Sequence, residues 1–231
     1  RVDGVARVTG QALYTHDIQW PGTLVGRFLR SPHPHARIVR LDASRAEELP
    51  GVRRVWHRGK PPPIPRLGGR EVFAEELAYQ GAEVAFLVAD DERILGDALA
   101  LIDVQYEVLP FVHNLPVALA EGAPVALAGT RDNLIEPDGE IYERGSVSEG
   151  LDAADTVVEV SVETPPAAHC CLETHGSAVR WEGDAVTVWH STQSVFGARS
   201  SLADALDVPL ERVRAICEYV GGGFGSKWGA E

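Results

Sequence analysis

The sequence lacks methionine altogether and is poor in cysteine and lysine. Its 231 residues contain no Met and begin at Arg1. Because translation starts at methionine, we expect a trimmed or processed N-terminus, so a secretion signal can be neither identified nor dismissed. The chain also ends at Glu231, six residues after Gly225 in its richest glycine stretch. We therefore expect a piece of a larger protein.

Cysteine is too scarce and too unevenly placed to form a disulfide framework. The three thiols are Cys170, Cys171 and Cys217, an odd number with two adjacent members. This usage is typical of a reducing compartment. Without a Cys-X-X-Cys pair, we expect neither an iron–sulfur cluster nor a structural zinc held by this chain alone. We predict a cytoplasmic location, with the periplasm as the alternative.

Positive charge is scarce as well. Lys and Arg number 21 against 34 Asp and Glu, a net charge of −13. This balance argues against nonspecific binding to nucleic acid or to anionic membranes. No apolar run approaches the roughly 20 residues that span a bilayer. With 45% hydrophobic residues, the chain can still form the core of one large domain or two ordinary ones.

The first half of the chain alternates strand-like and helical segments. The strand-like segments are 22–30, 36–41, 52–57, 83–89 and 104–108. Two helices are expected between them: a short one with the capping-box pattern of Ser44–Glu47, and one that Asp91 caps and that runs to about Ile102. Residues 111–140 then gather Asn, Pro and Gly, which indicates a connection with one helical turn.

The second half carries its own strand and helix signals. Strands are expected over 156–164, 177–181, 185–191 and 212–220, and a helix over 195–206. The short polar segment around Gly183 is typical of a hairpin turn. The last strand runs directly into a glycine-rich stretch, Gly221-Gly-Gly-Phe-Gly225.

This glycine stretch is the strongest local feature. Glycine has no Cβ and tolerates positive φ, so backbone N–H groups can approach a ligand closely. Such groups suit anions or oxo groups. The stretch is not a Walker loop, because Ser226-Lys227 reverses the required order, and its sixth position breaks the dinucleotide fingerprint. A tight turn that packs glycine against a neighbour is an equally good interpretation.

Two histidine clusters look like parts of metal sites. His33 and His35 flank a proline, and residues 169–175 place His, Cys, Glu and His within seven positions. Neither cluster has a standard zinc or iron spacing, so structural hydrogen bonding is favoured for both. We predict that no protein side chain here binds a metal directly.

Gln193 lies at the end of an expected strand, before a helix that Ser194 is placed to cap. Ligands of α/β layers gather at such strand ends, where a side-chain amide can donate to an anionic oxygen. A loop amide that binds nearby backbone is equally consistent with the sequence. Tyr219 and Trp228 flank the glycine stretch, and either line a pocket or pack in a core.

Four stretches occur together in a recognisable order. They are Arg7-Val-Thr-Gly-Gln-Ala-Leu-Tyr-Thr-His-Asp17, Leu29-Arg-Ser-Pro-His-Pro-His-Ala-Arg-Ile38, Leu172-Glu-Thr-His-Gly176 with Ser191-Thr-Gln193, and Tyr219-Val-Gly-Gly-Gly-Phe-Gly-Ser-Lys227. Together they resemble the molybdenum-binding subunit of the xanthine dehydrogenase, aldehyde oxidase and carbon monoxide dehydrogenase family. The resemblance implies an α+β fold. An α/β-hammerhead domain would occupy 1–112, an interdomain connection 113–140, and the incomplete N-terminal part of the first molybdopterin-binding domain 141–231.

The resemblance also implies roles for particular residues. In the family, a Ser-Thr-Gln glutamine lies beside the apical oxo group of the metal, and the Phe-Gly of the glycine motif contacts the cofactor through its backbone. These roles fall on Gln193 and on Phe224 with Gly225, and we expect Gly222 and Gly223 to bind the cofactor with them. The histidines of both clusters are structural in the family.

The implied activity is that of a molybdenum hydroxylase that uses water as its oxygen source and the molybdenum–molybdopterin cofactor. Electrons then leave through [2Fe–2S] clusters to FAD. The expected partners are the remainder of the molybdenum subunit, an iron–sulfur subunit, a FAD subunit and a small-molecule substrate. The family's catalytic glutamate base is expected beyond Glu231, so we predict no catalytic residue in this chain and no activity of the chain alone.

One position departs from the family pattern. Xanthine-type members carry a glutamate directly after the Lys of the glycine motif, where it binds the purine. This sequence has Trp228 there. An indole only donates hydrogen bonds, so it cannot accept one from a purine N–H as a carboxylate does. We therefore expect Trp228 in the substrate pocket, and an aldehyde or N-heteroaromatic substrate in place of xanthine.

A non-catalytic function is the alternative. The chain would then be a hammerhead-containing module that associates with a partner subunit, or a truncated pseudo-enzyme. Companion domains that carry the rest of the cofactor site would favour the enzyme. If the chain is alone, its incomplete second domain is expected to expose an apolar face and either to aggregate or to associate stably with another polypeptide.

Overall fold

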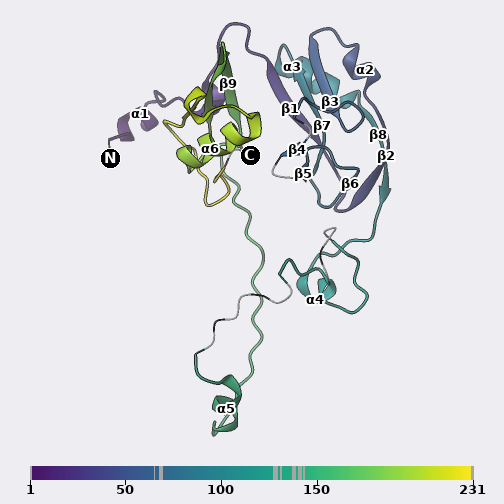
Figure 1. Ribbon diagram of the computed structural model, residues 1–231, viewed down its shortest axis with the longest axis vertical. Coiled ribbons are helices and arrows are strands. Elements are labelled where there is room, and N and C mark those ends of the chain that lie inside the picture. The colour runs from purple at the N-terminus through teal and green to yellow at the C-terminus, as the bar shows by residue number, and fades with distance from the viewer. Residues whose placement is uncertain are drawn as a thin grey trace. The chain divides into compact units, whose positions relative to one another are not determined.

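The computed structural model describes residues 2–64, 66, 67, 70–126, 130, 132–136, 139, 142 and 144–229. The chain divides into two compact units, Arg1–Leu109 with His169–Glu231, and Pro110–Ala168 (Figure 1).

The helices are α1 (Gly4–Val8), the 3-10 helix η1 (Thr15–Asp17), α2 (Ser44–Glu47), α3 (Glu92–Ala100), α4 (Leu115–Ala118), α5 (Val147–Asp152), α6 (Val195–Leu206) and the 3-10 helix η2 (Leu210–Arg212). The strands are β1 (Val25–Arg30), β2 (Ala36–Asp42), β3 (Val52–His57), β4 (Arg66–Leu67), β5 (Arg70–Glu71), β6 (Glu76–Leu77), β7 (Glu83–Ala89), β8 (Asp103–Val108), β9 (Ser177–Glu182), β10 (Ala185–His190) and β11 (Val213–Ile216).

The first sheet of the larger unit has β7 at its centre, with β1 and β3 antiparallel on either side. Its centre is buried because β7 is an almost uninterrupted apolar run, as the sequence predicts for residues 83–89. Helix α3 packs on this sheet through Leu95 and Ala98, both 0% exposed. The predicted cap of α3 is confirmed, since Asp91 Oδ1 accepts the Ile94 N–H at 2.8 Å. The predicted capping box of Ser44–Glu47 is wrong, because Ala43 is the N-cap of α2 and the Ser44 hydroxyl donates to Asp42 Oδ1 instead.

A second antiparallel sheet, in the order β6-β2-β8, shares a core with the first. Leu77 and Val84 are buried at this contact, with Ile38 and Val104 packed against them. The two sheets and their short helices contain every strand predicted between residues 22 and 108. Alternating apolar and polar positions therefore predicted this part of the chain well.

The third sheet, in the order β11-β10-β9, places the candidate site residues. Strand β10 pairs antiparallel with β9 through the predicted hairpin and parallel with β11. Helix α6 makes the crossover and covers a core of Val186, Val188, Ala203 and Val213. Because β10 and β11 are parallel neighbours, their carboxyl ends meet at one edge of the sheet. The segments that follow them, 191–193 and 217–225, therefore come together.

Two predicted strands of the second half are wrong, and Ser194 stands at the N-cap of α6 without a capping side-chain hydrogen bond. Residues 156–164 form no strand, and Val158, Val160 and Val162 are 73–81% exposed. Their alternation is strand-like, but no other strand of the described chain pairs with this segment, and a strand needs a backbone partner. The predicted strand over 212–220 is only Val213–Ile216 long, because the chain turns before the glycine stretch.

The smaller unit has little regular structure. Helix α4 supplies the helical turn predicted in this segment, and Asn114 caps it by accepting the Val117 N–H at 2.9 Å. The side chain of Asn133 holds the loop that follows, since it binds Ala126 N–H, Ala118 O and Pro124 O. The predicted boundary between residues 140 and 141 lies outside the described residues.

The prediction of an α+β fold is confirmed, since short helices flank separate, mainly antiparallel sheets. None of the helices formed by the described residues is both long and apolar enough to cross a membrane.

Candidate functional site

The glycine-rich stretch after β11 forms an irregular turn. Three of its residues have positive φ, namely Gly222 (120°), Phe224 (50°) and Gly225 (94°). Glycine adopts such values freely, whereas at Phe224 they cost about 1–2 kcal/mol. Ser226 closes the turn, because its N–H and its Oγ both donate to Gly223 O, at 2.9 and 2.8 Å. Strain that neighbouring bonds maintain at a non-glycine residue is a feature of functional loops.

Gln193 binds this turn through both its main chain and its side chain. Its N–H donates to Lys227 O at 2.7 Å, and its Oε1 accepts the N–H groups of Gly225 at 2.9 Å and Lys227 at 3.4 Å. A Cβ at Gly223 would stand 2.2 Å from Gln193 Oε1, so any side chain there would displace the Gln193 amide. Backbone N–H groups only donate, which identifies the atom facing the turn as the oxygen.

The amide nitrogen of Gln193 is left available. Within the described part of the chain, Nε2 has no hydrogen-bond partner, and the residue is exposed. The sequence leaves two interpretations of Gln193 open, binding to nearby backbone or donation to a ligand, and one amide can do both. The oxygen binds nearby backbone, and the nitrogen can still donate to a ligand.

The tip of the turn presents further donors. The N–H groups of Gly222, Gly223 and Phe224 bond to no group among the residues that the structure describes, whereas the N–H of Gly225 is taken by Gln193. Three successive free N–H groups next to a free side-chain amide suit an anionic or oxo ligand. The turn and the strand end thus form one set of donors.

A buried ion pair supports this turn. Lys227 is 1% exposed, and its ammonium donates to Ser191 Oγ and to Glu173 O at 2.8 Å each, with Glu173 Oε2 at 3.4 Å. The same Oε2 accepts the Gly221 N–H at 2.6 Å and the Ser191 hydroxyl at 2.8 Å. The network therefore reaches both ends of the turn.

The carboxyl group of Glu173 is ionised in this network. Burial alone would raise its pKa, but the hydrogen bonds from Gly221 N–H and Ser191 Oγ, with the charge of Lys227, outweigh burial and lower the pKa below 4.5. Its second oxygen, Oε1, is buried without a partner among the described residues. Buried acceptors are usually bonded, so this oxygen is the exception within the network.

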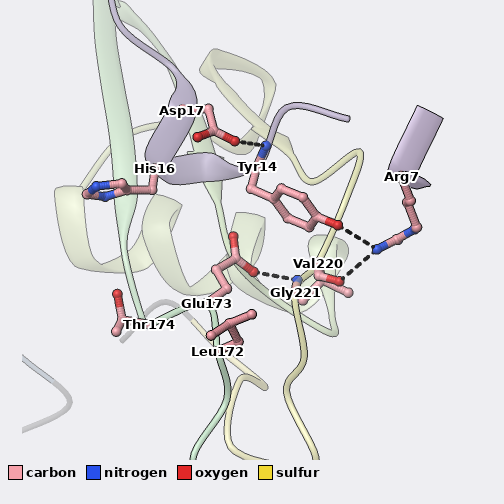
Figure 2. Close-up of a pocket in the computed structure, with 9 residues that line it drawn as sticks. All are labelled: Arg7, Tyr14, His16, Asp17, Leu172, Glu173, Thr174, Val220 and Gly221. Carbon is pink, nitrogen blue, oxygen red and sulfur yellow. Dashed lines mark hydrogen bonds between the residues drawn. The ribbon is translucent and has the colours of Figure 1, made fainter. Parts of the chain in front are cut away.

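A cavity of about 570 Å³ adjoins the network and is lined by residues that include Arg7, Tyr14 and Glu173. Figure 2 shows the Arg7 guanidinium reaching toward the Tyr14 hydroxyl and the Val220 carbonyl, to which it donates at 3.0 and 3.4 Å. The guanidinium also lies 5.8 Å from the ring centre of Tyr14 and 5.3 Å from that of Tyr219. Cation–π and hydrogen-bonding contacts thus attach the N-terminal segment to the glycine stretch.

Trp228 lies beside the turn with an accessible side chain. It is 61% exposed, and Phe224 is 74% exposed. The indole Nε1 is 3.9 Å from the point where a Cβ at Gly225 would stand. A ligand held by the turn would therefore meet an aromatic surface.

The histidines of the first cluster have structural contacts, whereas His169 and His175 of the second are exposed. His35 is buried and lies 3.1 Å from Glu76 Oε1, and His33 packs edge-on against Tyr106 with ring centres 5.0 Å apart. In the second cluster, Glu173 takes part in the ion pair with Lys227. No group of three or more His, Cys, Asp or Glu among the described residues is arranged to hold a metal ion.

The structure brings the sequence-predicted residues Gln193 and Trp228 together with the glycine stretch. Sequence reasoning missed the buried pair of Glu173 and Lys227. One signal was available: Lys60 and Lys227 are the only lysines, and every other basic residue of the chain, apart from histidine, is arginine. In a chain that otherwise uses arginine, a lysine next to a glycine-rich stretch points to a place where a compact ammonium fits better than a guanidinium.

Two family models match the chain. Residues 9–110 match the a/b hammerhead domain of aldehyde oxidase and xanthine dehydrogenase, and residues 128–231 match a molybdopterin cofactor-binding domain. The two matches follow the order that the resemblance implied.

Curated relatives match over almost the whole chain. The xanthine dehydrogenase molybdenum-binding subunit of Escherichia coli O157:H7 is 33% identical over 244 residues, which cover 98% of this chain and 32% of that protein. The carbon monoxide dehydrogenase large chain of Afipia carboxidovorans is 30% identical over 254 residues, 100% of this chain and 31% of that protein. The chain thus spans about a third of the length of these relatives.

Several solved structures also match over almost the whole chain. Quinoline 2-oxidoreductase from Pseudomonas putida 86 matches with a TM-score of 0.82 and 29% identity over 98% of this chain and 30% of that chain. The Cu,Mo-CO dehydrogenase matches with a TM-score of 0.77 and 29% identity over 99% of this chain and 31% of that chain. The aldehyde oxidoreductase from Desulfovibrio gigas, at 22% identity and a TM-score of 0.76, shares the fold.

Proposed function

The chain belongs to the molybdopterin-binding subunits of the xanthine dehydrogenase and aldehyde oxidase family, and from that premise we propose that it forms one wall of a molybdenum hydroxylase active site. Residues 1–112 are proposed as the hammerhead domain, 113–140 as the connection, and 141–231 as the N-terminal part of the first molybdopterin-binding domain. The complete protein would oxidise an aldehyde or N-heteroaromatic compound, with water as the oxygen source.

The position of Gln193 on the glycine turn carries this proposal. Its Oε1 is fixed by Gly225 and Lys227, which leaves Nε2 free beside the free N–H groups of the turn. The absence of a side chain at Gly223 makes this arrangement possible. Neutral N–H donors in a group suit the anionic and oxo oxygens of a molybdopterin cofactor, so the residues present fit this group.

The proposed roles are binding and orientation. Gln193 would donate to an oxo oxygen, and Gly222, Gly223 and Phe224 would donate from their backbone. Gly225, which the resemblance also places at the cofactor, gives its N–H to Gln193 and would shape the turn instead. When bound, the cofactor supplies the two-electron redox chemistry of hydroxylation. The catalytic glutamate base is proposed to lie outside residues 1–231.

The substrate proposal rests on Trp228. Its indole offers an aromatic face and one N–H donor, which suits a planar, weakly polar ring or an aldehyde better than an oxygen-rich purine. The similar structure from Pseudomonas putida 86 is a quinoline 2-oxidoreductase, which supports a heteroaromatic substrate. Several sequence relatives carry xanthine dehydrogenase names, so xanthine is the competing substrate to be tested.

The partners are proposed from the relatives. Several of these are named as subunits or large chains, which supports assembly with further polypeptides. Electrons would leave through [2Fe–2S] clusters to FAD on those subunits or domains. The three cysteines are free, which agrees with a proposed location in the reducing cytoplasm.

Metal and cofactor analysis of the complete native protein, with its intact mass, tests this proposal. Molybdenum together with a pterin, iron and flavin is the expected result. A preparation without molybdenum and pterin would contradict the proposed function. Comparable kcat/KM values for xanthine and for aldehydes or quinoline-type rings would contradict the substrate assignment alone.

A further inference from the structure

We infer that the buried pair of Lys227 and Glu173 is a positioning device that sets the glycine turn and Gln193 in their binding geometry before any cofactor arrives. The inference rests on the proposed function only for the identity of the ligand. Neither residue would touch the reacting atoms. Each acts through the backbone groups and the amide that it holds in place.

The pair connects the two ends of the turn. At the first end, Glu173 Oε2 accepts the Gly221 N–H at 2.6 Å. At the second end stands Lys227, whose ammonium binds Glu173 from within the core. One short chain of contacts thus fixes the separation of residues 221 and 227, and the free N–H groups lie between them.

The same lysine fixes the end of β10. Its ammonium donates to Ser191 Oγ at 2.8 Å, and its carbonyl accepts from Thr192 Oγ1 at 3.2 Å and from Gln193 N–H at 2.7 Å. Three successive residues after the strand are therefore bound to Lys227. The side-chain amide of Gln193 then has one orientation, because its oxygen also binds the Lys227 N–H.

An ionised pair is suited to fixing the conformation of the turn, because loss of either partner leaves the other charge buried without compensation. A buried ammonium is tolerated only when its donors are satisfied, and Lys227 Nζ has three acceptor oxygens for its three N–H bonds. Replacing such a pair by apolar groups often leaves stability unchanged, so a buried pair is better explained by the geometry that it imposes. Here that geometry is the conformation of the proposed cofactor turn.

Hydrogen exchange measured by mass spectrometry tests the inference on the full protein, produced in a host that makes no molybdopterin. The wild-type protein should protect the bonded amides of Gly221, Gly225, Ser226 and Lys227 without cofactor. The Lys227→Met variant should exchange these amides at least about tenfold faster, since an orphaned buried partner costs more than a single ordinary hydrogen bond. The Glu173→Gln variant, which keeps the side-chain shape, should show a smaller acceleration at the same amides.

The matched control is Val188→Ala, which opens a cavity in the core of the same sheet without touching the turn. It should lower the melting temperature and leave exchange over 221–227 close to wild type. Unprotected amides in the wild-type protein, wild-type exchange in Lys227→Met, or equal acceleration in Val188→Ala would each overturn the inference. If Lys227→Met does not fold, wild-type exchange in Glu173→Gln overturns it. A native protein without molybdopterin would refute the proposed function, and the exchange result would still decide the role of the pair.

Discussion

Gln193 Oε1 lies 2.2 Å from the point where a Cβ at Gly223 would stand, so a side chain at residue 223 would displace the Gln193 amide. The contact depends both on the Gln193 amide and on the absence of a side chain at Gly223. Gln193 needs this close approach to accept the Gly225 N–H at 2.9 Å. The site is therefore sensitive to the smallest possible addition at residue 223.

The Gly223→Ala variant should displace Gln193 from the turn and lose most of the bound cofactor. Breaking its bonds to Gly225 and Lys227 should lower cofactor occupancy about tenfold or more, since each lost hydrogen bond of this kind costs about 1 kcal/mol. Molybdenum content per polypeptide measures the effect. The control is Gly96→Ala in α3, where the new Cβ meets open space and should stabilise the helix by about 0.5–1 kcal/mol. Full molybdenum content in Gly223→Ala would show that the contact is not required.

The Gln193→Glu variant separates the two functions of the amide. A carboxylate can still accept the N–H groups of Gly225 and Lys227, but it offers no donor to a ligand. We expect a correctly folded protein with kcat lowered by about 100-fold, the usual effect of removing one preorganised donor. Steady-state kinetics together with thermal melting check this. A variant with unchanged kcat would show that the free Nε2 has no role in turnover.

Local patterns predicted most of the fold because each pattern reflects a contact between neighbours in sequence. The apolar run at 83–89 is short enough to predict a buried strand, and Asp91 caps its helix through a residue three positions away. The hairpin turn needs a residue with positive φ, and Gly183 supplies it with a φ of +64°, which glycine adopts freely. These elements then bring Gln193 to the glycine turn, because parallel β10 and β11 end at the same edge.

The parts that the sequence did not predict depend on distant partners. The Glu173–Lys227 pair joins residues 54 positions apart, and no periodicity encodes such a contact. The segment 156–164 has a strand pattern, but pairing depends on a neighbour that local sequence does not contain. Arg7 is another example, since it reaches Val220 across 213 positions.

Glu173 should make stability depend on pH in the acid range. Its pKa is lowered from 4.5 in the folded protein, so its contribution to stability is complete above about pH 4.5 and is lost as the pH falls through the folded value. The difference in melting temperature between wild type and Glu173→Gln should be constant from about pH 5 to 7 and should shrink below about pH 4.5. Other carboxylates titrate in both proteins and cancel in this difference. A difference that stays constant at acid pH would show that Glu173 is not ionised in the folded state.

Arg7 should hold the N-terminal segment against the glycine stretch. Its guanidinium contacts Tyr14, Tyr219 and the Val220 carbonyl at once, and only a planar fork can do this. Both Arg7→Met and Arg7→Lys should therefore speed hydrogen exchange in the segment that carries Tyr14, with little change in global melting. Arg53→Met, which removes an exposed pair with Asp90, is the control and should leave that segment unchanged. Wild-type exchange in Arg7→Lys would show that charge alone is sufficient.

Trp228→Glu should shift substrate preference toward xanthine. The carboxylate would supply an acceptor for a purine N–H at the position where the resemblance places a glutamate in xanthine-type members, and a hydrogen bond to a charged group contributes about 1.5–3 kcal/mol. The ratio of kcat/KM for xanthine to that for an aldehyde should therefore rise about tenfold or more. The matched control is Trp181→Glu on β9, which makes the same chemical change at a tryptophan that is 50% exposed and lies outside the turn. An unchanged ratio in Trp228→Glu, or an equal change in Trp181→Glu, would remove residue 228 from the determinants of specificity.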